Sequence, residues 1–106
     1  MKTKKQILKI INNNSNVLNT AIISKNQIGN ILKNVNGFAF NYILESNNKI
    51  IYIGYSSSLY YRLMQHKGTK NFDKVYLIMF NTKKTAKQIE KKLIKSFNPI
   101  NNYQYK

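Results

Sequence analysis

The sequence predicts an α/β (α+β) fold, and three observations support this class. Segments 38–45 and 49–54 are rich in aromatic and β-branched residues and are separated by a short polar turn, which is typical of a β-hairpin. The apolar run 74–80 lacks a helical period and predicts a buried strand. Segments with helical spacing follow the hairpin and this strand, so the predicted order is β-β-α-β-α.

We divide the 106 residues into a helical N-terminal extension, 1–36, and a main domain, 37–106. Segment 3–13 carries isoleucines at positions i, i+3 and i+4 and predicts a short amphipathic helix. A second helix is predicted from Ser24, a suitable N-cap, to about Val35.

The alternation of side chains along the hairpin assigns its two central tyrosines to faces of the sheet. Tyr42 shares a face with the other alternate large residues of its strand. Tyr52 is predicted to share a face with Ile50 and Gly54. Because the strands of a hairpin pair, we expect the two tyrosines to lie on neighbouring strands.

Two helices complete the main domain. The serine run before Leu59 can cap a helix over 58–67, and Gly68 is its predicted stop. The last helix is predicted to begin at Thr82 or Thr85 and to end before Pro99.

The composition predicts a polyanionic partner. A formal net charge of +15, from 18 basic and 3 acidic residues, attracts nucleic acid first and acidic membrane surfaces second. Codon bias explains part of the lysine content but not the scarcity of acidic residues. No apolar run is long enough to cross a membrane, and we expect no signal peptide. Cysteine is absent, which excludes disulfides and thiolate metal sites and fits a cytoplasmic protein.

Arg62 and His66 are the single arginine and the single histidine of the chain. They lie four residues apart in the predicted helix 58–67, so they project from one side of it. Arginine offers phosphate a planar fork of donors that lysine lacks. A lone histidine is more often a surface or packing residue, but this pairing predicts a functional site.

Glu90 lies beside Ile89 in the last predicted helix, close to its apolar seam. A carboxylate in that position is unfavourable unless a cation pairs with it. A divalent metal, Arg62 or a lysine would serve. The alternative is that Glu90 pairs with Lys87 or Lys91 on a solvated flank.

Tyr42 and Tyr52 complete a set that can cleave a phosphodiester. A carboxylate holds Mg²⁺, which needs few protein ligands when phosphate oxygens complete its shell. An arginine stabilises the charge of the transition state, and a tyrosine or histidine takes a proton from water. For most tyrosines packing is the simpler explanation, and four receive no role: Tyr55, Tyr60, Tyr61 and Tyr76.

At these residues the sequence resembles the GIY-YIG nuclease superfamily. YIG occurs literally at 52–54, and Tyr42 stands ten residues before Tyr52, close to the separation of the family's two tyrosine motifs. The continuation YSSSLYYRLMQH resembles the family's pattern after YIG. The late segment IEKKLIKSFNPINN resembles its glutamate helix and terminal Pro-x-x-Asn. The resemblance spans about 38–102 and implies a three-stranded antiparallel sheet flanked by helices.

The resemblance also implies metal-dependent hydrolysis of DNA, with Mg²⁺ or Mn²⁺ as the cofactor. By position, Tyr42 and Tyr52 are the tyrosines of the two motifs, each a candidate general base. Gly54 permits close backbone packing beside the site. Arg62 binds phosphate, and His66 is a proton acceptor or a partner of tyrosine.

Two further positions follow from the late segment. Glu90 matches the metal ligand of the family, and Asn102 matches the asparagine that orients the site. Asn101 is the alternative candidate for that asparagine. One departure stands in the first motif, where Phe40 and Asn41 replace glycine and isoleucine. A bulky residue there is expected to alter the end of the hairpin or the access of substrate.

The sequence therefore predicts a small DNA endonuclease with DNA as its partner and no membrane association. The alternative is a catalytically inactive nucleic-acid-binding module on the same fold that regulates another protein. A basic structural or membrane-surface protein would explain the charge but not the residue set. A homodimer stays open. The small size and an amino-acid composition typical of an AT-rich genome suit a phage or mobile element. The expected compartment is then the cytoplasm of an infected bacterial host.

Overall fold

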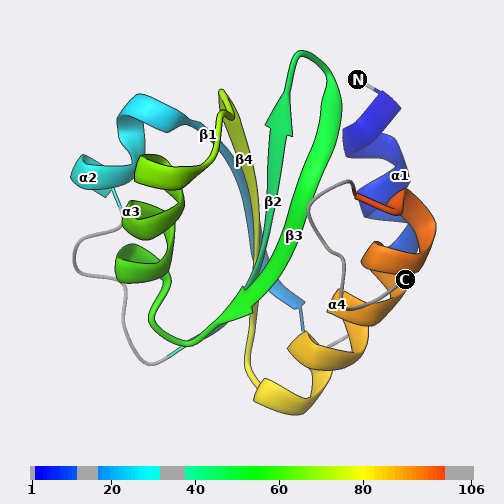
Figure 1. The fold of residues 1–106 in the computed structure, drawn as a ribbon. Helices are drawn as coiled ribbons and strands as arrows, with labels where there is room; N and C mark the ends of the chain where they lie inside the picture. The colour runs from blue at the N-terminus through cyan, green and yellow to red at the C-terminus, as the bar shows by residue number, and fades with distance from the viewer. Residues whose placement is uncertain (1, 12–16, 32–37, 100–106) are drawn as a thin grey trace.

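Helices cover both faces of an antiparallel sheet in the computed structural model, which describes residues 2–11, 17–31 and 38–99 (Figure 1). The elements along the chain are α1 (Lys2–Ile11), β1 (Val17–Ser24), the 3-10 helix η1 (Lys25–Gln27), α2 (Ile28–Ile31), β2 (Ala39–Ser46), β3 (Lys49–Ser56), α3 (Leu59–Thr69), β4 (Lys74–Phe80) and α4 (Lys83–Phe97). The strand order is β1-β4-β2-β3, and all neighbours are antiparallel. The predicted order β-β-α-β-α from residue 38 onward is confirmed.

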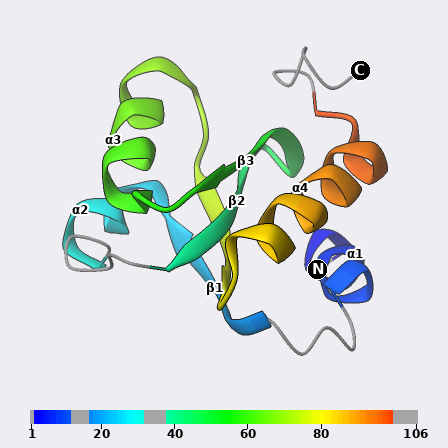
Figure 2. The same ribbon diagram turned by 90° about the horizontal axis from the view of Figure 1, so that it is seen from below.

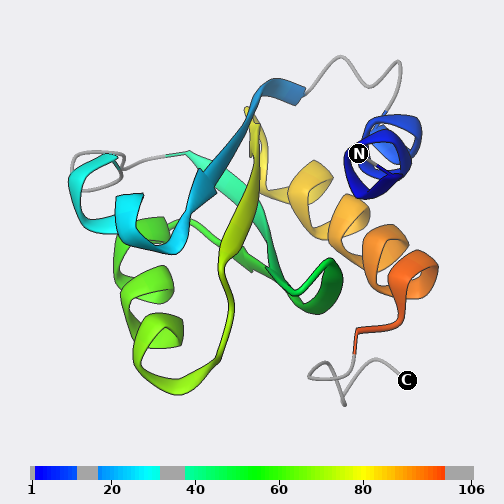
Figure 3. The same ribbon diagram turned by 90° about the horizontal axis from the view of Figure 1, so that it is seen from above.

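The sheet has two apolar faces, each covered by helices (Figures 2 and 3). We call the side of α2 and α3 the α3 face and the side of α1 and α4 the α4 face. The α3 face buries Ile23, Ile28, Phe40, Tyr42, Leu44, Leu59, Leu63, Phe72, Val75 and Leu77. The α4 face buries Ile7, Ile11, Ala39, Ile43, Ile53, Tyr76, Ile78, Phe80, Ala86, Ile89, Leu93 and Ile94. None of the described helices is long and apolar enough to span a membrane.

The predicted hairpin is confirmed as β2 and β3. Asn47 and Asn48 connect the strands with φ values of 51° and 67°. Two consecutive positive φ values are those of the tight turn whose twist matches paired strands, and asparagine tolerates them better than most residues. Local sequence therefore fixes the register at which Tyr42 lies opposite Gly54.

A β-bulge overturns one prediction about β3. Leu44 pairs with Tyr52, but Glu45 pairs with Ile50, so Ile51 is an extra residue in the ladder. An extra residue reverses the alternation of side chains beyond it. Ile50 therefore packs with the α4 face and Tyr52 with the α3 face, and the prediction that they share a face is wrong.

The sheet has four strands, and the predicted three-stranded sheet is wrong in this respect. The additional strand is β1, which pairs only with β4 at the edge of the described sheet. Its apolar residues do not alternate with polar ones, and Ile23 is its one buried side chain. Partnership with a strand more than fifty residues away, and not local periodicity, holds it in place.

The helical predictions for the extension hold in part. Helix α1 covers residues 3–11 of the segment predicted as a helix, 3–13, and residues 12–16 lie outside the described part of the chain. The described part of the helix predicted over 24–35 consists of η1 and the short α2, and residues 32–37 lie outside the described part of the chain. Ser24 does mark the start, because its backbone N–H donates to Gln27 Oε1 at 2.8 Å.

Both helices of the main domain occur where they were predicted. Helix α3 continues through Gly68, the predicted stop, and ends at Thr69. Helix α4 begins after Thr82, whose hydroxyl oxygen accepts a hydrogen bond from the Thr85 backbone at 3.2 Å. Asn98, with a φ of 46°, ends α4 in a left-handed conformation.

Candidate active site

A pocket of about 440 Å³ lies beside β3 and receives side chains from both faces of the sheet. Its lining residues are Tyr42, Tyr52, Tyr55, Arg62, Lys87, Glu90 and Lys91. Because β3 is an edge strand, side chains from α3 and from α4 can meet past it. Figure 3 shows α3 and α4 on opposite sides of the sheet. The pocket nevertheless receives side chains from both helices.

Tyr42 and Tyr52 line this pocket and form a contiguous aromatic cluster with His66, which does not itself line it. The Tyr42 hydroxyl lies 2.9 Å from His66 Nε2, within hydrogen-bond distance. The His66 ring centroid is 5.4 Å from that of Tyr42 and 4.8 Å from that of Tyr52. The two tyrosine centroids are 6.0 Å apart. The predicted neighbourhood of both tyrosines and the histidine is therefore present in three dimensions.

Gly54 allows the Tyr42 ring to occupy its position. A Cβ atom on Gly54 would overlap Cζ and the hydroxyl oxygen of Tyr42, which lies opposite on β2. Real side chains never approach so closely, so any larger residue would displace the ring. This is the close packing expected for Gly54.

His66 is held in its neutral form. Burial, and after it the nearby positive charges of Lys70 and Arg62, together lower the pKa of His66 to about 4. Its Nδ1 atom has no hydrogen-bond partner among the described residues. The Nε2 atom of a neutral imidazole can accept a hydrogen bond from the Tyr42 hydroxyl.

Tyr42 keeps its proton in the free protein. Burial raises its pKa most, Tyr52 and Glu90 raise it as well, and Arg62 opposes them. Arg62 and Glu90 line the same pocket as this phenol. Tyr42 is therefore a hydrogen-bonded hydroxyl and not a phenolate.

Glu90 stands half-buried on the α4 side of the pocket. Burial raises its pKa, whereas the nearby Lys87 and Lys91 lower it. No described residue forms an ion pair with Glu90, and Lys87 instead places its Nζ 5.6 Å from the Tyr55 ring centroid. The carboxylate thus borders the pocket without an ion-paired cation from the described part of the chain.

The donor set suits a hard divalent cation whose coordination shell is completed by oxygen atoms of the substrate. The described residues contain no cluster of three or more His, Cys, Asp and Glu side chains, and Glu90 is the one carboxylate that lines the pocket. Mg²⁺ is commonly bound through one or two carboxylates together with phosphate oxygens and water. A partly desolvated carboxylate without an ion pair fits this mode.

Lys70 is a site neighbour that the sequence analysis missed. Its Nζ lies 4.8 Å from the Tyr52 ring centroid, and Lys70 also acts on the pKa of His66. Tyr55, to which no role was assigned, lines the pocket as well. The spacing of Lys70 four residues after His66 was a usable signal, but lysine is too common in this chain to stand out.

The departure from the family's first motif does not reach the pocket. Phe40 is 5% exposed within the α3 face, and Asn41 is fully buried; neither lines the pocket. The predicted orienting residue Asn102 and its substitute Asn101 lie outside the described residues.

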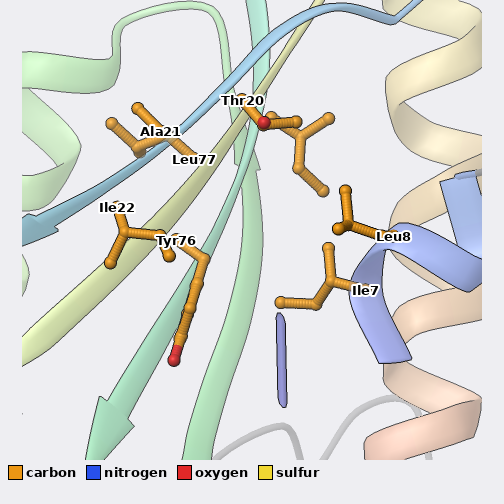
Figure 4. Close-up of a pocket in the computed structure, with 8 residues that line it drawn as sticks. Ile7, Leu8, Thr20, Ala21, Ile22, Tyr76 and Leu77 are labelled. Carbon is orange, nitrogen blue, oxygen red and sulfur yellow. The ribbon is translucent and has the colours of Figure 1, made fainter. Parts of the chain in front are cut away.

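Another hollow, of about 290 Å³, lies between α1 and the β1–β4 pair (Figure 4). Its lining is mostly apolar and contains no charged side chain: Ile7, Leu8, Thr20, Ala21, Ile22, Tyr76, Leu77 and Ile78. Without a cation or a carboxylate it lacks the groups needed for phosphate chemistry. The chemistry-bearing residues therefore gather at the edge of β3.

The fold and this pocket define a small α+β domain equipped for hydrolytic phosphate chemistry. The model of the GIY-YIG catalytic domain family matches residues 38–104, so the chain belongs to the GIY-YIG family. This membership makes it a nuclease domain, a hydrolase whose substrate is nucleic acid. Neither the curated proteins nor the solved structures contain a match to the chain.

Proposed function

We propose that this protein is a metal-dependent DNA endonuclease that hydrolyses phosphodiester bonds at the pocket beside β3. One observation carries the proposal. Arg62 and Glu90 belong to helices on opposite faces of the sheet, yet they line the same pocket together with the phenols of Tyr42 and Tyr52. Residues that served only packing or solubility would not need to converge in this way.

Phosphate binding falls to the basic residues of the pocket. The planar guanidinium of Arg62 can donate two parallel hydrogen bonds to one phosphate. Lys87 and Lys91 add positive charge on the opposite wall, and the net charge of +15 attracts a polyanion from a distance. In the transition state the added negative charge on the phosphate strengthens the contact with Arg62.

Proton transfer is assigned to the tyrosine–histidine cluster. The Tyr42 hydroxyl can accept a proton from the attacking water while donating its own to His66 Nε2, 2.9 Å away. This relay needs no phenolate in the free enzyme. An anionic phosphate beside Arg62 offsets the positive charges that lower the pKa of His66, which makes the imidazole a better acceptor when substrate is bound. Tyr52 is the second candidate base.

Glu90 is proposed to hold the metal ion, Mg²⁺ or Mn²⁺. When bound, the ion would polarise the phosphate and stabilise the leaving oxygen. Its positive charge would also keep the Glu90 carboxyl ionised against the effect of burial. One such pocket cuts one strand at a time, so a double-strand break requires two copies or two encounters.

The test is incubation of the purified chain with supercoiled plasmid and Mg²⁺, with and without EDTA. We expect nicking by the wild type, a loss of about 100-fold or more in Glu90→Gln and Arg62→Ala, and no nicking in EDTA. Lys95→Ala, an exposed lysine of α4 that does not line the pocket, is the matched control and should retain full activity.

Binding must be measured on the same proteins. Glu90→Gln should still bind DNA, because it removes no positive charge, and its thermal unfolding should match the wild type. If all variants bind DNA tightly and none, including the wild type, nicks it, the regulatory DNA-binding module is the correct account.

A further inference from the structure

A neighbouring pocket of about 470 Å³ adjoins the candidate active site at the start of α3. Its lining residues are Tyr55, Ser56, Ser57, Ser58, Tyr61, Arg62 and Gln65. Two of them, Tyr55 and Arg62, also line the pocket that contains Glu90. The two hollows are therefore adjacent parts of one groove, with Arg62 at their junction.

Tyr61 is the most exposed of the large hydrophobic side chains identified at the surface, at 72%. Its ring stands edge-on to that of Tyr60, with centroids 5.4 Å apart and an interplanar angle of 80°. Tyr60 itself packs partly into the α3 face, so it gives Tyr61 a fixed neighbour. An aromatic ring held at the wall of a basic groove is a stacking surface for a nucleobase.

The floor of this pocket offers polar groups. Ser56 is 6% exposed, and its hydroxyl accepts a hydrogen bond from the Ser58 backbone at 2.8 Å, which fixes the loop before α3. Ser57 and Ser58 remain exposed, and the Ser58 side chain makes no capping hydrogen bond to α3. Two free hydroxyls beside the guanidinium of Arg62 suit the sugar and phosphate of a nucleotide.

We propose that this groove holds the nucleotide next to the scissile phosphate in an unpaired state, with its base stacked on Tyr61. The inference rests on the proposed function, because it places the scissile phosphate at Arg62. Within a duplex both faces of a base are covered by its neighbours, so the ring of Tyr61 can stack only on a base that has left the helix. The preferred substrate class is therefore DNA with an unpaired nucleotide beside the cut, such as a flap, a bulge or a single-stranded junction.

The test is equilibrium binding of two fluorescent DNA hairpins in EDTA, where the metal-dependent reaction is blocked. One hairpin is fully paired, because a non-nucleotide linker replaces its loop, and the other has the same length and linker but one mismatched pair that leaves a nucleotide unpaired; both have the same number of phosphates, so the sequence-independent electrostatic contribution is equal. We expect the wild type to bind the hairpin with the unpaired nucleotide about 10-fold more tightly, within the range for one base–aromatic stack.

Three variants test whether the Tyr61 ring causes this preference. Tyr61→Ala should remove the preference, Tyr61→Phe should keep it, and Met64→Ala, which also removes an exposed apolar side chain from α3, should leave it unchanged. Because Tyr61 is exposed, its replacement does not threaten the fold. Equal binding of the two hairpins by the wild type, or a preference that survives in Tyr61→Ala, overturns the inference.

Cleavage with Mg²⁺, measured separately, distinguishes this inference from the proposed function. Cutting without a preference that depends on Tyr61 would reject the nucleotide subsite and leave the nuclease proposal standing. A preference that depends on Tyr61 in a protein that never cuts would support the subsite and reject the nuclease proposal.

Discussion

Two consecutive residues of β2, Asn41 and Tyr42, differ in the hydrogen bonding of their buried polar groups on the two faces of the sheet. Tyr42 points to the α3 face, where its hydroxyl lies 2.9 Å from His66 Nε2 at the wall of the pocket. Asn41 points to the other face and is fully buried, and neither its Oδ1 nor its Nδ2 has a hydrogen-bond partner among the described residues. On the same face, the buried Glu45 accepts a hydrogen bond from Tyr76 at 3.1 Å.

Buried polar groups in this protein are therefore of two kinds. Tyr42 belongs to a site, whereas the unpaired amide of Asn41 only destabilises the fold through its desolvation. Tyr42 lines the pocket and connects it to His66, which does not line it, through the hydroxyl contact with Nε2. Asn41 is fully buried and does not line the pocket. A change to Tyr42 or His66 should therefore impair activity, whereas removal of the unpaired Asn41 amide should stabilise the fold.

The largest expected effect comes from Gly54→Ala. The added Cβ would overlap the Tyr42 ring, so the ring must move or the hairpin must distort. We expect a loss of about 3 kcal/mol in the free energy of unfolding and a loss of activity of about 100-fold or more. Urea denaturation and plasmid nicking measure the two losses.

Gly68→Ala is the matched control for this substitution. Gly68 lies in α3, and a Cβ atom there would meet nothing within 4 Å among the described residues. We expect a gain of up to about 1 kcal/mol, since alanine favours a helix more than glycine does. Equal effects of the two substitutions would contradict the role assigned to Gly54.

The second effect concerns pH and tests the burial of His66. An unfolded histidine binds a proton near pH 6.5, whereas the folded His66 binds one only near its pKa of about 4. The unfolded state therefore gains protons first as the pH falls through this window, and stability should fall with it, by up to about 3 kcal/mol at the lower end.

His66→Gln separates this effect from the titration of carboxyl groups. Glutamine keeps a hydrogen-bonding side chain but does not titrate. The free energy of unfolding of the variant should therefore depend less on pH between about 6.5 and 4. Denaturant midpoints at a series of pH values provide the measurement. Parallel curves for the two proteins would mean that His66 is not held neutral by its surroundings.

The smallest effect is a gain on the α4 face. Asn41→Val replaces an unpaired buried amide with an apolar side chain that favours strands, so we expect about 1 kcal/mol of added stability and unchanged nicking. Asn19→Val on the exposed part of β1 is the control, and its effect should lie within about 0.5 kcal/mol. A destabilised Asn41→Val protein would show that the amide has a structural role after all.

The sequence made much of the site predictable because its residues lie on strongly periodic elements. Helical spacing placed Arg62 and His66 on one side of α3, and the asparagine turn set Tyr42 and Tyr52 on paired strands. The same local reasoning failed at β1 and at the bulge of Ile51, where pairing with a distant strand or an extra residue overrides the local pattern.

The sequence by itself determined the hairpin, the main helices and the rare residue types that carry the chemistry, since these depend on neighbours within a few positions. Only the tertiary structure decided that Glu90 meets Arg62 at one pocket, that Lys70 lies over the Tyr52 ring, and that Gly54 supports the Tyr42 ring. These contacts join residues distant in the chain, and the packing of two helices around an edge strand brings them together.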